Sequence, residues 1–401
     1  MQATLPRRSH LRLGPRLALS RRYTTPVVAG LSIVLIYAFS PVPLYLTAAA
    51  GLGVSDGTLQ SGFFAAFASA GVVSIVLSLW TRSPIGFGWS APALLYMVAA
   101  APTHSPGELA GACLLAGLAM TVMAAVPWAD ALTRLAPMPV VMGVFAGSSI
   151  GYMTGAAGAA GAEPIFAGAP IAGYFLARAL RVAWLPPVAG ALALGLVALA
   201  TQGQLHPVAI TPELPPVAPL VPEFSLAGAV TLALPLIVLS HGVLNLQAYA
   251  VLEQAGYPPP RRAILGLTGL LTMVHGLFAA PPAGMQKASL AIMTGEDSGT
   301  KDVRWLSAVV ASIGAIAIAF CATSIAAFVA GLPAAFVVAL MGVVLLPIVV
   351  DATRSAFTAE AGMAGALAFF VAASAFELWG ISAAFWGRVV GVAAMRVRRW
   401  A

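Results

Sequence analysis

Lys287 is the basic residue whose position most strongly suggests a chemical role. The other nineteen Lys and Arg residues can be assigned to the termini or to polar loops, but Lys287 stands within an apolar stretch. A charged side chain in such a segment is costly to desolvate, so it marks a functional site by default. The alternative is that the lysine lies near the end of the segment and extends its amine to water. As a functional residue it could pair with an anion and could also carry a proton.

Residues 84–92 and 281–289 are the segments most able to form a site around this lysine. Both combine prolines and glycines within an apolar run, so neither can be a regular helix throughout. A broken helix exposes free N–H groups, and the N-terminus of the following half-helix carries a partial positive charge that suits an anion. We therefore expect the two segments to face each other around a small anionic substrate. The candidate substrate-binding residues in them are Trp89, Ser90, Pro92, Gln286, Lys287 and Ser289.

The first proline of each segment, Pro84 and Pro281, gives one way to match the two. Under this match Lys287 lies opposite Ser90. The alternative is a pair of proline kinks in packed helices that bind no ligand.

A second polar cluster lies in the apolar segment 226–252. His241 and Asn245 are four residues apart and share a helix face, and Gln247 follows them. We expect these three side chains to contribute to the same binding cavity. For the proton the candidates are Lys287, His241 and Glu377. The alternatives are a packed, hydrogen-bonded histidine and a glutamate at the outer end of its segment.

The composition places these residues in a membrane protein. The chain is 60% hydrophobic and only 8% charged, which excludes a soluble domain. Its net charge of +7 is explained by basic cytoplasmic loops rather than by nucleic acid, which we do not expect as a partner. The two cysteines and five histidines lack the spacing of a metal site, and no phosphate-binding loop is present, so we expect no cofactor and no metal.

The apolar segments predict an all-α integral membrane protein with about fourteen transmembrane helices, including broken third and tenth spans. We expect two inverted repeats of seven spans, residues 27–201 and 226–395, joined by an external proline-rich linker at 202–225. Residues 1–26 and 396–401 are then cytoplasmic tails, and Arg388 is counted with the cytoplasmic C-terminus. The predicted transmembrane segments are 27–48, 59–80, 84–100, 107–127, 137–154, 163–178, 182–201, 226–252, 262–279, 281–294, 305–330, 333–350, 355–374 and 378–395.

Four motifs occur in order along most of the chain. They are Trp89-Ser90 followed by Pro92, the run from Asn245 to Tyr257, Thr294-Gly295-Glu296 followed by Arg304-Trp305, and residues 380–387. In these stretches the sequence resembles the bacterial benzoate:proton symporters, the BenE-type benzoate membrane transport proteins. That family is similar to nucleobase/ascorbate transporters.

The resemblance implies a fold of seven plus seven spans with a core and a gate domain, and proton-coupled uptake of an aromatic carboxylate. The chain departs from the family pattern at two places. Residues 244–248 keep only the Asn of the family's Gln-Asn-x-Pro-Gly, and Gln286 and Lys287 stand where an Asn and small residues are usual. These departures bear on whether benzoate itself is the substrate, while a lysine still favours an anion.

The function we expect is secondary active import of a small organic anion, such as benzoate, coupled to protons. The alternatives are an anion channel or uniporter and a nucleobase-type transporter of the same fold. We do not expect an enzyme, because no nucleophile elbow or metal-binding HExxH motif supports one. The expected location is the bacterial cytoplasmic (inner) membrane, with both termini cytoplasmic and with a homodimer as an arrangement that the sequence leaves open.

Overall fold

The computed structural model describes residues 15–39, 41–126, 138–180, 187–206, 208–358, 363–374, 377–378 and 381–398, which are mostly helical. The first half contains α1 (Pro15–Phe39), α2 (Pro41–Ala49), α3 (Asp56–Thr81), β1 (Phe87–Trp89), α4 (Ala91–Ala100), α5 (Pro106–Ala125), α7 (Met138–Ala162), α8 (Pro164–Leu180) and α9 (Pro187–Thr201). Short 3-10 turns, η1 (Ala50–Leu52) and η2 (Ala101–Thr103), follow α2 and α4.

The second half begins with one long helix of mixed winding, made of α10 (Leu226–Gly228), η3 (Ala229–Ala233), α11 (Leu234–Ile237), η4 (Val238–Asn245) and α12 (Leu246–Gln254). Then come α13 (Arg261–Gly276), β2 (Ala283–Met285), α14 (Lys287–Thr294), η5 (Glu296–Ser298), α15 (Trp305–Phe320), α16 (Ala322–Ala330), α17 (Ala334–Ala356), α18 (Ala364–Ala373), β3 (Glu377–Leu378), β4 (Ile381–Ser382) and α19 (Ala383–Arg398). These elements fall within or close to the apolar segments expected from the sequence.

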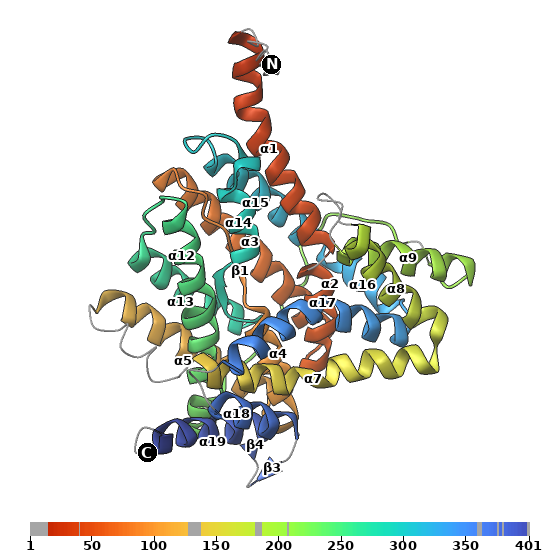
Figure 1. The fold of residues 1–401 in the computed structure, drawn as a ribbon, viewed down its shortest axis with the longest axis vertical. Coiled ribbons are helices and arrows are strands. Elements are labelled where there is room, and N and C mark those ends of the chain that lie inside the picture. The colour runs from red at the N-terminus through yellow and green to blue at the C-terminus, as the bar shows by residue number, and fades with distance from the viewer. Residues whose placement is uncertain are drawn as a thin grey trace, which may run out of the picture.

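The helices pack as two bundles. In the first bundle α3 packs on α15, α15 on α1, and α5 on α13; in the second, α7 packs on α17 and α18, α8 on α9, and α18 on α19. Figure 1 shows α8 and α9 on one side of the molecule and α18 and α19 at its lower end, with β1 and α14 near the centre. The bundles meet where α2 contacts α17 and where α4 contacts α7.

Small residues allow the helices to approach closely. A Cβ added to Gly117 of α5 would lie 2.5 Å from the carbonyl oxygen of Gly269 in α13, so these two backbones touch. Close contact of this kind is a common way for helices to associate in a membrane, where apolar burial provides little drive.

Six described helices are long and apolar enough to cross a membrane, or seven if the bent pair α15 and α16 is counted as one span. The two members of that pair meet at 63°. Large apolar side chains such as Val72, Val76 and Trp80 on α3 are exposed, which is the arrangement that a lipid-facing helix requires. The number of crossings is therefore at least six by this criterion, while four shorter apolar helices accompany them.

Residues 202–225, the stretch expected to be a linker, contain no helix or strand in the part that is described. The linker is bound to the ends of three helices by main-chain hydrogen bonds: Glu213 N–H donates to Phe320 O, Leu220 N–H to Leu277 O, and Glu223 N–H to Gly107 O.

Candidate functional site

The two proline- and glycine-rich segments cross as short strands. β1 and β2 are antiparallel, and their register pairs Phe87 with Met285, Gly88 with Gly284, and Trp89 with Ala283. Each strand leads directly into a half-helix, α4 or α14. The expectation that residues 84–92 and 281–289 are broken and face each other is therefore correct.

The matching of the two segments by their prolines is wrong by one residue. The crossing is centred on Gly88 and Gly284. The hydrogen bonds on either side of this centre are equivalent between the two segments: Ser90 N–H donates to Pro282 O, and Gln286 N–H donates to Gly86 O. Ser90 thus corresponds to Gln286, and both are the N-cap residues of their half-helices. Lys287 corresponds to Ala91, because the strand hydrogen bonds, not the prolines, set the register.

The centre of the crossing has little room for side chains. A Cβ at Gly88 would lie 2.7 Å from Cγ of Gln286, and one at Gly284 would lie 2.9 Å from Cδ2 of Leu244. Glycine is therefore favoured here by the close approach of the Gln286 side chain to Gly88 and of Leu244 in η4 to Gly284.

Polar side chains of α3 accept hydrogen bonds from backbone N–H groups in β1 and just before it. Phe87 N–H donates to Ser74 Oγ at 2.7 Å, and Ile85 N–H donates to Ser78 Oγ at 3.1 Å. Both serines lie on α3 and are buried. Without them the strand would leave unpaired N–H groups in an apolar interior, which costs about 1–3 kcal/mol each.

β2 is held in the same way by the second half of the chain. Ala283 N–H donates to Thr272 Oγ1 at 3.1 Å, and Met285 N–H donates to Asn245 Oδ1 at 3.0 Å. Asn245 also donates from Nδ2 to Thr268 Oγ1 at 2.9 Å. Asn245 is fully buried and acts on the strand, so its contacts give it a positioning role.

The sequence reading missed these supports. Ser74 and Ser78 on α3 and Thr268 and Thr272 on α13 are pairs of hydroxyl residues four apart in otherwise apolar helices. This spacing puts two hydroxyls on one helix face and was the signal that could have found them.

His275 is a further buried residue that the sequence reading missed. Its Nδ1 lies 2.8 Å from Pro281 O and its Nε2 lies 2.9 Å from Ser69 Oγ. The ring therefore joins α3 to the turn that leads into β2. In the sequence it was one histidine among five with no distinctive spacing.

The two N-caps differ. Ser90 Oγ accepts a hydrogen bond from Ala93 N–H at 3.2 Å, which caps α4. Gln286 makes no side-chain cap on α14; its Nε2 instead crosses to Trp89 O at 2.6 Å. The first N–H groups of α14 are therefore not satisfied by their own cap side chain and can donate hydrogen bonds to an anion.

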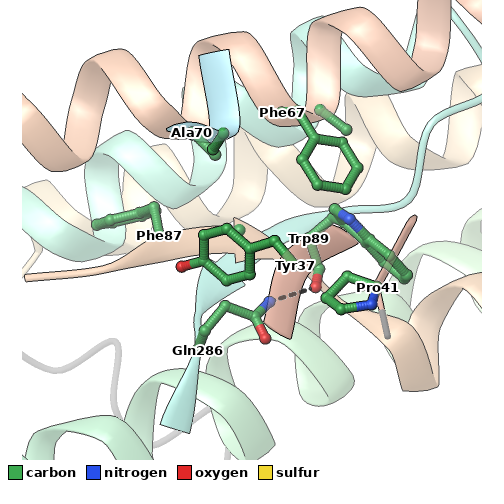
Figure 2. Close-up of a pocket in the computed structure, with 10 residues that line it drawn as sticks. Tyr37, Pro41, Phe67, Ala70, Phe87, Trp89 and Gln286 are labelled. Carbon is green, nitrogen blue, oxygen red and sulfur yellow. Dashed lines mark hydrogen bonds between the residues drawn. The ribbon is translucent and has the colours of Figure 1, made fainter. Parts of the chain in front are cut away.

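A cavity of about 20 Å³, room for about one water molecule, adjoins this crossing. Its aromatic lining comes from Tyr37 of α1, Phe67 of α3, and Phe87 and Trp89 of β1, and Gln286 adds an amide. Figure 2 shows Tyr37 beside Gln286, with Phe67 and Trp89 along one side and Pro41 next to them. A planar ring enters beside the N-terminus of α14 only if these side chains move apart.

More aromatic rings lie behind Trp89. The ring centroids of Tyr45 and Trp89 are 5.3 Å apart at an interplanar angle of 80°, and Phe63 and Phe67 stack at 4.5 Å. Edge-to-face and stacked contacts of this kind hold the indole in one orientation.

The structure places Trp89, Ser90, Gln286 and Ser289 together at the crossing. Ser289 is buried in the first turn of α14. Pro92 is half-buried in the first turn of α4 and does not line the cavity.

The remaining expected residues are less central. Lys287 is exposed as the first residue of α14, so the protein does not enclose it. The helix start turns this side chain out of the bundle. Gln247 is also exposed. His241 is buried, and its ring centroid lies 6.4 Å from that of Tyr249. Neither His241 nor Asn245 lines the cavity at Trp89, so the expectation of one shared cavity is not met.

Two expectations fall near the C-terminal hairpin. The backbone of Glu377 belongs to β3, which pairs with β4, but its side chain lies outside the described residues. Arg388 was counted with the cytoplasmic C-terminus, yet it lies within α19, half-buried beside a second cavity. The predicted segment 378–395 itself includes this arginine.

Comparison with known proteins now adds a family. Residues 21–397 match the model of BenE, the benzoate membrane transport protein. The chain belongs to the BenE family. It is therefore a multi-pass membrane transporter rather than an enzyme, as expected from the sequence.

Two curated relatives cover nearly the whole chain. Inner membrane protein YdcO of Escherichia coli is 27% identical over 369 residues, which are 91% of this chain and 93% of the relative. The benzoate membrane transport protein of Acinetobacter baylyi is 26% identical over 369 residues, 92% of this chain and 93% of the relative.

Solved structures show the same fold at low identity. The transmembrane domain of a cyanobacterium bicarbonate transporter, BicA, has a TM-score of 0.59 and 13% identity, with 93% of this chain and 98% of that chain covered. The murine anion transporter Slc26a9 in its inward-facing state has a TM-score of 0.60 and 14% identity, with 99% and 73% covered.

Proposed function

We propose that this protein imports an aromatic carboxylate such as benzoate across the bacterial inner membrane, coupled to protons. The observation that carries the proposal is the aromatic cavity beside the uncapped N-terminus of α14. Tyr37, Phe67 and Trp89 provide rings for an aromatic body, and the free N–H groups of α14 provide donors for a carboxylate. The name of the Acinetobacter relative, a benzoate membrane transport protein, supports the same substrate class.

We assign the carboxylate to the first turn of α14. Gln286 borders the cavity and fixes the strand before this turn through its bond to Trp89 O. The exposed Lys287 adds a positive charge next to the helix N-terminus, where it would raise the local concentration of anions.

We infer that the fourteen apolar segments cross the membrane as two inverted repeats. The equivalent hydrogen bonds of Ser90 and Gln286 support this, as do the matched supports Ser74 and Thr272. Both termini would be cytoplasmic and residues 202–225 external. Lys287, His241 and Glu377 are the candidates for the coupling proton. A homodimer is the assembly to test by mass measurement in detergent.

Uptake into proteoliposomes tests the function. The purified protein is expected to accumulate radiolabelled benzoate above equilibrium when the vesicle exterior is acidic, and a protonophore should abolish accumulation. Accumulation that never exceeds equilibrium would instead establish a channel or uniporter. Uptake of radiolabelled uracil that unlabelled benzoate does not inhibit would instead establish a nucleobase transporter. A lack of any uptake or binding of aromatic carboxylates would contradict the proposal.

A further inference from the structure

A second cavity lies between the two bundles, with Arg388 in its wall. It has a volume of about 20 Å³, so a ligand larger than water enters only as the two bundles move apart, and apart from Arg388 its lining is almost wholly apolar. Tyr96 comes from α4, Val238 from η4, Phe145 from α7 and Arg388 from α19. The cavity is therefore bounded by elements of both bundles, unlike the cavity at Trp89.

The charge of Arg388 has no counter-ion among the described residues. None of the ion pairs formed by the described residues includes it, and the structure gives it no hydrogen-bonded acceptor there. A half-buried guanidinium in an apolar wall is unfavourable unless an anion compensates it. The site thus has a fixed cation with donors still available.

Tyr96 is the other polar group in the wall, and its hydroxyl is already used. It donates to Thr231 O. Pro235 lacks the N–H that would bond this carbonyl in a regular helix, which explains why the carbonyl is available to the tyrosine. The cavity therefore offers one cationic fork and otherwise apolar surface.

The position of this cavity relates it to the first one. Tyr96 follows Ser90 by six residues on α4, so it lies about 9 Å farther along the helix at ~1.5 Å per residue. Thr231 also contacts His104 through its Oγ1, at 2.8 Å, and His104 lies close to the end of the molecule that carries the linker 202–225. The Arg388 cavity is thus between the crossing and the linker end.

We propose that Arg388 and this cavity form a second anion site, which takes the carboxylate of an apolar-bodied monocarboxylate. Arginine binds a carboxylate through two parallel hydrogen bonds, and Phe145, Val238 and the ring of Tyr96 contact the apolar body. The ligand is the transported carboxylate itself or the carboxylate of a fatty acid from the membrane. If the ligand is the transported carboxylate, the inference rests on the proposed function. The presence of an anion site at Arg388 does not depend on that function.

Chemical protection of Arg388 tests the site without relying on transport. Phenylglyoxal is reacted with the detergent-purified protein, and its adduct on Arg388 is measured by mass spectrometry with and without benzoate, oleate or chloride. Benzoate is expected to slow modification of Arg388 at least fivefold while modification of the exposed Arg396 is unchanged. Protection by oleate alone would identify a lipid carboxylate. If neither carboxylate protects Arg388 more than chloride does, the proposal is overturned.

Binding stoichiometry gives the second test. The wild type is expected to bind close to two benzoate molecules per chain, and Arg388→Gln close to one, with an uptake KM raised about tenfold because a charged hydrogen bond is lost. Arg396→Gln on the same helix is the matched control and should behave as wild type. Folding is checked by the melting temperature, and Arg388→Lys, which keeps the charge, should recover part of the binding if the fold is intact.

The two proposals can fail separately. Protection of Arg388 by carboxylates with no benzoate uptake would refute the import function and keep the second site. Normal uptake with a wild-type KM and benzoate stoichiometry in Arg388→Gln, together with no protection of Arg388 by oleate, would refute the second site and keep the import function.

Discussion

The two half-helices at the crossing share a frame but begin differently. α4 is capped by its own Ser90, whereas the cap residue of α14, Gln286, turns away to bond Trp89 on the other strand. The N–H groups of α4 are thus partly satisfied by the protein, and those of α14 are left for another acceptor. Two related segments can therefore have different roles: the N-terminus of α4 is capped by the protein, and the N-terminus of α14 is available to a ligand.

The supports of the two strands differ as well. β1 is held by two hydroxyls of one helix, Ser74 and Ser78, whereas β2 is held by Thr272 of α13 and by Asn245 of η4. The second strand therefore depends on two helices at once. A change in the long mixed helix 226–254 can move β2, while β1 follows α3 alone.

Asn245→Ala is expected to have the largest effect. It removes the acceptor of Met285 N–H and the donor to Thr268, so unfolding should become easier by about 2–4 kcal/mol and uptake should fall more than tenfold. Ser74→Ala removes one acceptor and should cost about 1–3 kcal/mol. Thermal or denaturant unfolding in detergent measures both. Equal losses in the two variants would remove the contrast between the strands.

Gln286→Ala and Ser90→Ala test the division between ligand and structure. Gln286→Ala should raise the KM for benzoate about tenfold with a small change in melting temperature, since its amide borders the cavity. Ser90→Ala should lower stability by about 1 kcal/mol through the lost cap and change KM by less than about threefold. The reverse assignment of the two effects would show that α4, not α14, receives the anion.

Lys287→Ala should have a smaller effect because the side chain is exposed. A charge near a helix N-terminus changes anion binding by about 0.3–1 kcal/mol, so KM should rise about two- to fivefold. The rise should shrink in high salt, and Lys287→Arg should restore most of the affinity. Loss of all binding in Lys287→Ala, unrelieved by Lys287→Arg, would instead require a direct and specific contact.

The smallest expected effect concerns His104, which lies in the turn before α5. Burial lowers its pKa, and the nearby Glu108 only partly offsets this. The unfolded chain therefore binds the proton first, so stability should fall as pH drops below about 6.5 toward the lower folded-state pKa. The melting temperature of wild type and of His104→Gln is compared at pH 7.5 and 5.5. A wild-type decrease no larger than that of His104→Gln would leave the histidine without this role.

The sequence by itself determined the class of protein and the place of its broken segments. Apolar runs specify membrane helices because lipid cannot satisfy a free backbone, and proline with glycine interrupts them. From these facts the crossing of residues 84–92 with 281–289 could be predicted, together with Trp89, Ser90 and Gln286. The four ordered motifs were enough to indicate the family, which the comparison across residues 21–397 bears out.

The register of the crossing and the surroundings of each charged residue depend on contacts between segments that are distant in sequence. Hydrogen bonds between strands far apart in sequence make Ser90 the counterpart of Gln286, and no local pattern contains that information. The surroundings of Lys287 and Arg388 differ from those expected for the same reason. Local hydropathy shows what flanks a residue along the chain, whereas burial depends on which helices pack against it, so the lysine is exposed and the arginine lies between two bundles.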